Sequence, residues 1–291
     1  MVTPPQENRL NGFVLRLFAA FLFTALAAAV HALDGAVPLG QVVFWRSIVA
    51  LGVIVLYMAA RHQFPAGLRT RRPLGHLARS IFGTASMFLS FTALVYLPVA
   101  TAQALSFLAP VLTLPMAAFA LRERITGTLM LSVLLGFAGV VAILWDALSL
   151  PGSGALIGVM AGLAFALTSS VVRVHIKALT LTESAAGIAF YFSITATMVG
   201  LCTLPMGWVA PTVPQYGLLI GAGVLGGIGQ IAMTESVSRA PVSVLAPFDY
   251  TAMIWALGFD LVLFATVPGL FELLGAALIT AAALIVVIRR S

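Results

Sequence analysis

Positive charge in this 291-residue chain alternates between the gaps that separate its apolar runs. Of its fifteen Lys and Arg residues, fourteen lie before the first run, after the last run, or beside every second gap, and only Arg46 departs from this pattern. The gaps in between hold Asp34 and Asp146 and no basic residue. Because basic loops of membrane proteins stay on the cytoplasmic side, the alternation predicts a polytopic membrane protein with both termini in the cytoplasm.

Composition supports the same class. The chain is 61% hydrophobic and only 8% charged, whereas soluble domains carry about 25% charged residues. A helical span requires about 20 mostly apolar residues, and the pattern predicts an all-α protein with ten such spans. The predicted spans are 12–33, 38–60, 74–96, 99–121, 127–145, 153–175, 182–204, 214–236, 241–264 and 269–288.

The net charge of +6 does not indicate a nucleic-acid partner. The basic residues lie in clusters beside apolar runs, so the lipid bilayer and its anionic headgroups are the expected partner. A single cysteine, Cys202, excludes an internal disulfide. No Cys/His cluster and no phosphate-binding motif is present, so we expect no metal, no cofactor and no ATP-driven step.

Two stretches of the sequence resemble each other at a constant offset of 143 residues. Residues 98–107 read PVATAQALSF and residues 241–250 read PVSVLAPFDY. This divides the chain into repeats at 1–146 and 150–291, each with five spans. Because five is odd, the second repeat enters the membrane from the opposite side, which makes the two repeats inverted. Inverted repeats are a recurrent plan of secondary transporters, whose substrate binds near the midplane of the membrane.

Short motifs in both halves resemble the EamA family of the drug/metabolite transporter superfamily, and the length and pattern are most similar to YddG-type bacterial amino-acid exporters. The motifs are LSFLAPVLTLP at 105–115, LRERIT at 121–126, GFAGVVAI at 136–143, FWRS at 44–47, PFDYT at 247–251 and LGAALI at 274–279. The resemblance implies an inner-membrane carrier that exports amino acids, above all aromatic and other neutral ones (Phe, Trp, Tyr, Met, Thr), as a monomer or homodimer. A carrier of another metabolite or drug (a purine, an S-adenosylmethionine-like compound or a cationic drug) is the alternative.

Arg46 is the first candidate binding residue, since it lies about eight residues inside the second predicted span. Ionisable groups at such depth are costly and are functional candidates by default. Its guanidinium suits a substrate carboxylate. The competing interpretation is a structural ion pair with Asp260.

Asp249 and Tyr250 follow Pro247 inside the ninth predicted span. A proline removes a helical hydrogen bond and opens a kink whose backbone faces a cavity. Asp249 is therefore either a site for a substrate ammonium or a proton, or a contact between helices.

Further polar and aromatic residues within the spans suit a mainly apolar pocket with a few polar anchors. Each is alternatively a packing or lipid-facing residue. They are Phe82, Ser86, Gln103, Phe107, Tyr191, Gln230 and Trp255.

An intramembrane enzyme and a channel are the other classes considered. No His-Glu-x-x-His sequence is present, and the segment that ends in Asp260 lacks the Gly-x-Gly-Asp pattern of aspartyl sites. No span carries the continuous polar stripe that a channel requires. We therefore predict a carrier without catalytic residues.

Overall fold

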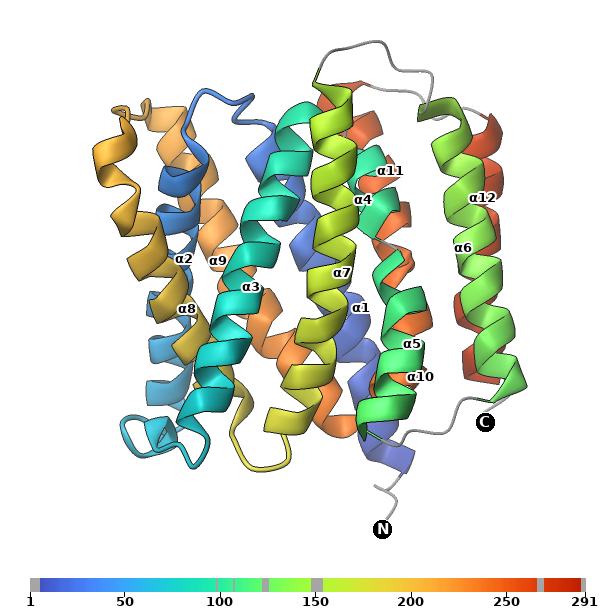
Figure 1. Cartoon of the computed structure of the whole chain (residues 1–291), viewed down its shortest axis with the longest axis horizontal. Helices are drawn as coiled ribbons and strands as arrows, with labels where there is room; N and C mark the ends of the chain where they lie inside the picture. The colour runs from blue at the N-terminus through green and yellow to red at the C-terminus, as the bar shows by residue number, and fades with distance from the viewer. Residues whose placement is uncertain are drawn as a thin grey trace.

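The computed structural model describes residues 6–97, 99–106, 108–121, 126–147, 154–265 and 270–288, and these residues are helical and contain no strand. The helices stand side by side in an upright bundle (Figure 1). They are α1 (Gln6–His31), α2 (Leu39–Ala60), α3 (Pro73–Tyr96), α4 (Val99–Ser106), α5 (Leu108–Leu121), α6 (Gly127–Ala147), α7 (Ala155–Leu179), α8 (Ala185–Cys202), α9 (Val213–Arg239), α10 (Val242–Asp249), α11 (Thr251–Phe264) and α12 (Leu270–Ile288), with 3₁₀ turns at Ala66–Leu68 and Leu204–Met206.

Local sequence signals explain where several helices begin. Pro73 is the first residue of α3, where its missing N–H would have no helical partner in any case. Ser184 precedes α8, and its hydroxyl accepts the backbone N–H of Gly187 at 3.0 Å. Thr212 precedes α9, and its backbone N–H donates to the side-chain carbonyl of Gln215 at 2.8 Å.

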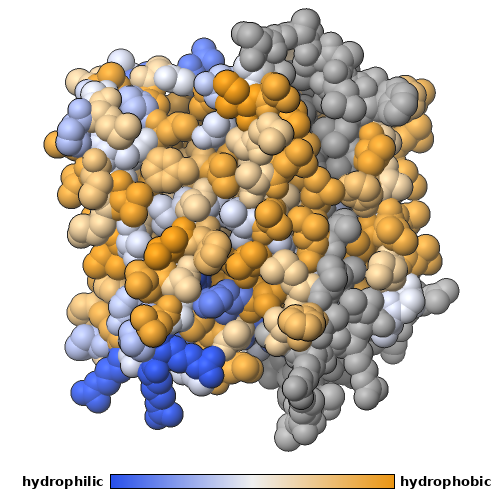
Figure 2. All heavy atoms as spheres, viewed as in Figure 1, coloured by the Kyte–Doolittle hydropathy of each residue, from blue (hydrophilic) through white to orange (hydrophobic). Residues whose placement is uncertain are grey.

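Six helices are long and apolar enough to cross a membrane: α1, α2, α3, α7, α8 and α9. The face shown in Figure 2 is mostly apolar, and its strongly hydrophilic side chains gather at one end of the bundle. Exposed arginines of the loop between α2 and α3 lie at that end, and α1 begins and α12 finishes there as well (Figure 1). Soluble monomers rarely expose so large an apolar surface. The chain is therefore a multi-pass membrane protein.

Each of the ten predicted ranges overlaps one helix or two consecutive helices, with ends that differ by a few residues. The range 99–121 contains α4 and α5, and the range 241–264 contains α10 and α11. Between α10 and α11 the helix is interrupted at Tyr250, three residues after Pro247. Because proline has no N–H to donate to the carbonyl four residues earlier, Pro247 weakens the helix in the turn that precedes this interruption.

The two sequence halves interdigitate rather than form separate bundles. Helix α1 packs along α9, α3 along α7, and α2 along α8, while α6 lies against α12 and the α4/α5 pair contacts the α10/α11 pair. Glycines allow the closest approaches: an added Cβ at Gly200 of α8 would lie 2.7 Å from the backbone nitrogen of Phe44 in α2. The space between α1, α3, α7 and α9 is thus bordered by both halves.

Candidate functional site

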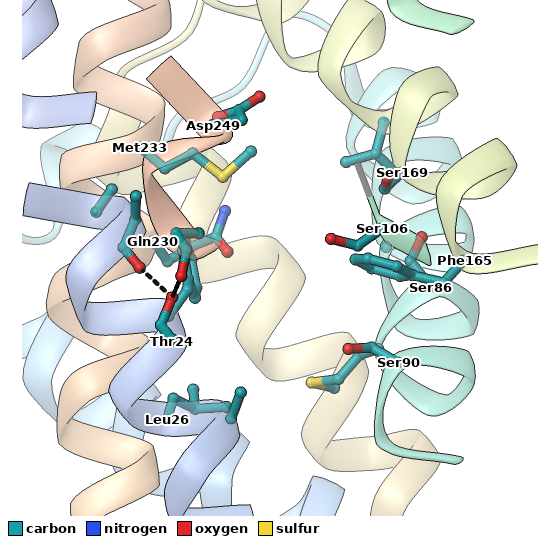
Figure 3. Close-up of a pocket in the computed structure, with 18 of the residues that line it drawn as sticks. Thr24, Leu26, Ser86, Ser90, Ser106, Phe165, Ser169, Gln230, Met233 and Asp249 are labelled. Carbon is teal, nitrogen blue, oxygen red and sulfur yellow. Dashed lines mark hydrogen bonds between the residues drawn. The ribbon is translucent and has the colours of Figure 1, made fainter. Parts of the chain in front are cut away.

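A cavity of about 230 Å³ lies between the two halves, lined by residues from α1, α2, α3 and α4 on one side of the sequence and from α7 to α11 on the other. Figure 3 shows two facing walls: Thr24, Gln230, Met233 and Asp249 on one, and hydroxyls from α3, α4 and α7 on the other. This volume is below the range of about 300–1,000 Å³ that is typical of pockets for drug-sized ligands. It suits a compact metabolite.

Asp249 is held between two arginines from different helices. The Arg16 Nε donates to Asp249 Oδ1 at 2.5 Å, and Arg173 donates to Oδ2. All three residues line the cavity, and the carboxylate is almost completely buried. One acid therefore ties α1, α7 and α10 together and partly neutralises two cations.

Arg46 and Arg79 form a second cationic pair, with no acid beside it in the part of the chain that the structure describes. Their guanidinium carbons lie over the ring of Phe192, at 5.7 Å and 4.0 Å from its centroid. Each arginine is only 3% exposed. The ring supplies a cation–π attraction to both, but it offers no hydrogen-bond acceptor of the strength of a carboxylate.

Several donors in this pair are unsatisfied. The Nε and Nη1 atoms of both Arg46 and Arg79 are buried and lack a hydrogen-bond partner, as does Nε2 of Gln230. A buried donor without a partner costs about 1–3 kcal/mol, and more for a charged group. Buried donors without a protein acceptor call for an acceptor from water or from a bound ligand.

The opposite wall carries hydroxyl groups. Ser86 and Thr168 share a hydrogen bond of 2.6 Å, and Ser90, Ser106 and Ser169 also line the cavity. Their position across from Gln230 is visible in Figure 3. These groups can orient polar atoms of a ligand without adding charge.

Four of the residues singled out from the sequence line the cavity: Arg46, Ser86, Gln230 and Asp249. They come from α2, α3, α9 and α10, so only the tertiary fold brings them together. No ion pair joins Arg46 to Asp260 among the described residues, and Arg46 lines the cavity instead.

Two aromatic candidates face away from the cavity. Phe82 is 44% exposed on the outer face of α3, one residue before the cavity-lining Gly83. Trp255 is 41% exposed and packs edge-on against Phe21, with ring centroids 5.1 Å apart. Helical phase decides that these rings point away from the cavity, because neighbouring residues of a helix point about 100° apart.

The two tyrosines have structural partners. Tyr191 donates its hydroxyl hydrogen to the Leu68 carbonyl at 2.6 Å, at the loop after α2. Tyr250 is fully buried and donates to the Val133 carbonyl at 3.3 Å. Neither lines the cavity.

The side chain of Gln103 and all of Phe107 lie outside the described residues.

Sequence reasoning missed three of the four cavity arginines. Arg16, Arg79 and Arg173 were counted with the cytoplasmic loops, yet each lies one to three turns inside its helix. The available signal was their depth within apolar runs, since an arginine that far from a helix end is a candidate for function. Among the described residues no group of His, Cys, Asp or Glu side chains could hold a metal ion.

A membrane-crossing helical bundle with a cavity at the interface of its halves, lined mainly by apolar residues with a few charged ones, is consistent with a small-molecule carrier. Residues 10–145 match the model of the EamA-like transporter family. This match, over the first half of the chain, supports the EamA-like transporter family that the motifs lead one to expect.

Similar proteins agree with this assignment. The pseudopaline exporter CntI of Pseudomonas aeruginosa (strain UCBPP-PA14) is 28% identical over 278 residues, which cover 94% of each protein. An S-adenosylmethionine uptake transporter of Rickettsia bellii is 27% identical over 248 residues, 84% of this chain and 80% of that protein. One solved crystal structure has a TM-score of 0.81 over 97% of this chain and 98% of its own; at 24% identity it shows the shared fold. General small-molecule transport follows from these findings.

Proposed function

We propose that this protein is a secondary carrier of the bacterial inner membrane that exports an amino-acid-type metabolite, whose carboxylate binds at Arg46 and Arg79. The observation that carries the proposal is the pair of buried guanidinium groups whose donors lack partners at the central cavity. Arginine binds carboxylates through paired, charge-assisted hydrogen bonds. The transported metabolite leaves the cell chemically unchanged.

Alternating access requires two arrangements of similar energy, which inverted repeats supply. The helix contacts support such repeats at 1–146 and 150–291. If α1 corresponds to α7, and α3 to α9, then the α1–α9 contact has its counterpart in the α3–α7 contact, and both are extensive. If α2 likewise corresponds to α8, and α6 to α12, exchanging the repeats leaves the α2–α8 and α6–α12 contacts in place. On this basis we propose ten spans with both termini in the cytoplasm.

Rings on the cavity wall support a substrate with an apolar or aromatic side chain. Phe23, Phe91 and Phe165 line the cavity together with Phe192, and aromatic pairs gain about 0.5–1.5 kcal/mol beyond burial. Neutral amino acids such as Phe, Trp, Tyr, Met or Thr are thus candidate cargos. S-adenosylmethionine also carries an amino-acid carboxylate, so relatives named for its uptake are compatible with the same contact. A purely cationic drug would meet four arginines and is disfavoured.

Transport by the purified full chain in proteoliposomes tests the proposal. We expect counterflow of a labelled amino acid, inhibited by unlabelled competitors that retain the carboxylate and not by the corresponding amines. Loss of one charged donor, in Arg46→Gln or Arg79→Gln, costs about 1.5–3 kcal/mol and should weaken binding ten- to a hundredfold. The exposed loop variant Arg69→Gln is the matched control. Equal inhibition by amines and amino acids would disprove carboxylate recognition.

A further inference from the structure

We propose that the cargo is a net-anionic metabolite with at least two carboxylates, and that Arg46, Arg79 and Gln230 form the subsite for this extra negative charge. The inference rests on the proposed function, because it specifies the class of amino-acid-type molecule that the same cavity takes. It changes the expected cargo from a neutral amino acid to an acidic one.

Charge balance in the cavity is the first argument. Its lining contains four arginines and one aspartate. Asp249 already contacts Arg16 and Arg173, so its charge is shared by that pair. Arg46 and Arg79 stack on one ring, and no described acid pairs with either. Two buried like charges without a counter-ion are strongly disfavoured, so the bound state calls for more than one negative charge.

A zwitterion does not satisfy this requirement. A neutral amino acid brings one carboxylate and one ammonium, and so it leaves the net charge of the cavity unchanged. A molecule with two carboxylates and one ammonium lowers the net charge of the cavity by one. A third acidic group would lower this net charge further. The difference grows in a low-dielectric site, where charges interact more strongly than in water.

The number of donors leads to the same class. Arg46 and Arg79 each keep two buried nitrogens without partners, and Gln230 adds a fifth. Each guanidinium can bind a carboxylate bidentately, so two arginines can hold two carboxylates, with the amide donating to either. Gly226 lets the guanidinium of Arg46 pack closely on α9, since an added Cβ there would lie 2.7 Å from Nε of Arg46 and 2.8 Å from its Nη2.

The remaining walls fit the rest of such a molecule. Serine hydroxyls face Gln230 across the cavity in Figure 3 and suit an ammonium or hydroxyl group. Export also agrees with a net-negative cargo, because an inside-negative potential favours the outward movement of anions by roughly fiftyfold per charge per 100 mV.

Competition between matched acids and amides is the decisive experiment. Binding to the purified full chain is measured by thermal stabilisation and by inhibition of counterflow, with glutamate against glutamine and 2-aminoadipate against its side-chain amide. We expect each acid to bind at least tenfold more tightly than its amide. Equal binding of acid and amide overturns this inference while the proposed function stands. Binding of neither overturns this inference, and counterflow of Phe, Trp, Met or Thr then tests the proposed function separately.

Two further arms test the chemistry and the residues. Phosphoserine presents a phosphate in place of the second carboxylate, and binding tenfold tighter than glutamate would overturn the carboxylate assignment. In Arg46→Gln and Arg79→Gln the ratio of the affinity for each acid to the affinity for its amide should fall towards one. Arg79→Lys and the loop control Arg69→Gln should retain most of this preference. A purely structural role would lower both affinities and leave the ratio unchanged, which would contradict the subsite.

Discussion

At the scale of single residues, the structure separates two kinds of buried arginine. Arg16 and Arg173 have a carboxylate partner, whereas Arg46 and Arg79 have only the ring of Phe192. A paired cation contributes to the architecture, since it links helices. An unpaired buried cation is costly, which is why we propose a binding role for Arg46 and Arg79.

Replacing Asp249 by asparagine should therefore destabilise the fold. The change leaves Arg16 and Arg173 as buried charges without a counter-ion, at a cost of about 3–5 kcal/mol. We expect a lower Tm of the purified protein in detergent. Asp34→Asn is the control, because Asp34 is exposed at a φ of 48° that asparagine also tolerates. An unchanged Tm for the Asp249 variant would show that the two ion pairs contribute nothing.

At the scale of helices, close packing depends on where glycine occurs. An added Cβ at Gly200 would lie 2.7 Å from the nitrogen and 2.8 Å from the Cα of Phe44. These are backbone atoms, so no side-chain rotation can relieve the overlap. The contact of α2 with α8 holds Arg46 and Phe192 in register, which connects packing to the cavity.

We expect Gly200→Ala to separate α2 from α8 and to cost about 1–3 kcal/mol. Gly217→Ala is the matched control, since nothing lies within 4 Å of an added Cβ there. Alanine is about 1 kcal/mol more favourable than glycine within a helix, so this control should be neutral or stabilising. Thermal unfolding followed by tryptophan fluorescence distinguishes the two; equal Tm values would refute the packing argument.

A polar contact outside the spans fastens the α2–α3 loop to the α7–α8 turn. Burial alone would raise the pKa of Glu183, but hydrogen bonds from the backbone N–H of Arg71 and the side chains of His76 and Thr70 together hold this pKa below its usual value. The Arg71 contact is 3.0 Å and the His76 contact 3.3 Å. The carboxylate thus binds the loop in its ionised form.

Because this pKa is lowered in the folded state, the contact contributes fully above the ordinary glutamate pKa of about 4.3. Its contribution is lost as the pH falls through the folded-state value. Hydrogen exchange of loop residues 61–72 should therefore increase, relative to the core helices, when the pH is lowered below about 4. Glu183→Gln should exchange rapidly already at pH 7; protection unaffected by this substitution would argue against the contact.

At the scale of the whole molecule, sidedness follows from the charge pattern. The described ends of α1 and α12 and the arginine-rich α2–α3 loop lie at one end of the bundle (Figure 1). Basic loops are retained in the cytoplasm, so this end should face inward. Helix α8 then finishes on the outer side, with the exposed Cys202 as its last residue.

Labelling of Cys202 tests this orientation with the native sequence. A membrane-impermeant maleimide should label intact cells that express the protein, and Cys202→Ser should abolish the signal. A reporter fused to Ser291 should report a cytoplasmic C-terminus. Labelling only after cell lysis would reverse the orientation.

The sequence alone determined the class of protein, the positions of the helices and the family. These properties depend on local quantities: apolar run length, loop charge and short motifs, which are read along one stretch of chain. Arg46, Ser86, Gln230 and Asp249 were found in the same way, because a polar group within an apolar run is conspicuous.

Only the tertiary structure decided which charges face each other. Arg16, Arg79 and Arg173 lie one to three turns inside α1, α3 and α7, and only the rotation and contacts of these helices decide that they line the cavity. The choice between partners for Arg46 was open for the same reason. The sequence allows Arg46 either to pair with Asp260 or to line a cavity. Helix phase and packing direct its guanidinium towards Arg79 and Phe192. Charge balance is a property of the assembled cavity, and it is this balance that favours an acidic cargo.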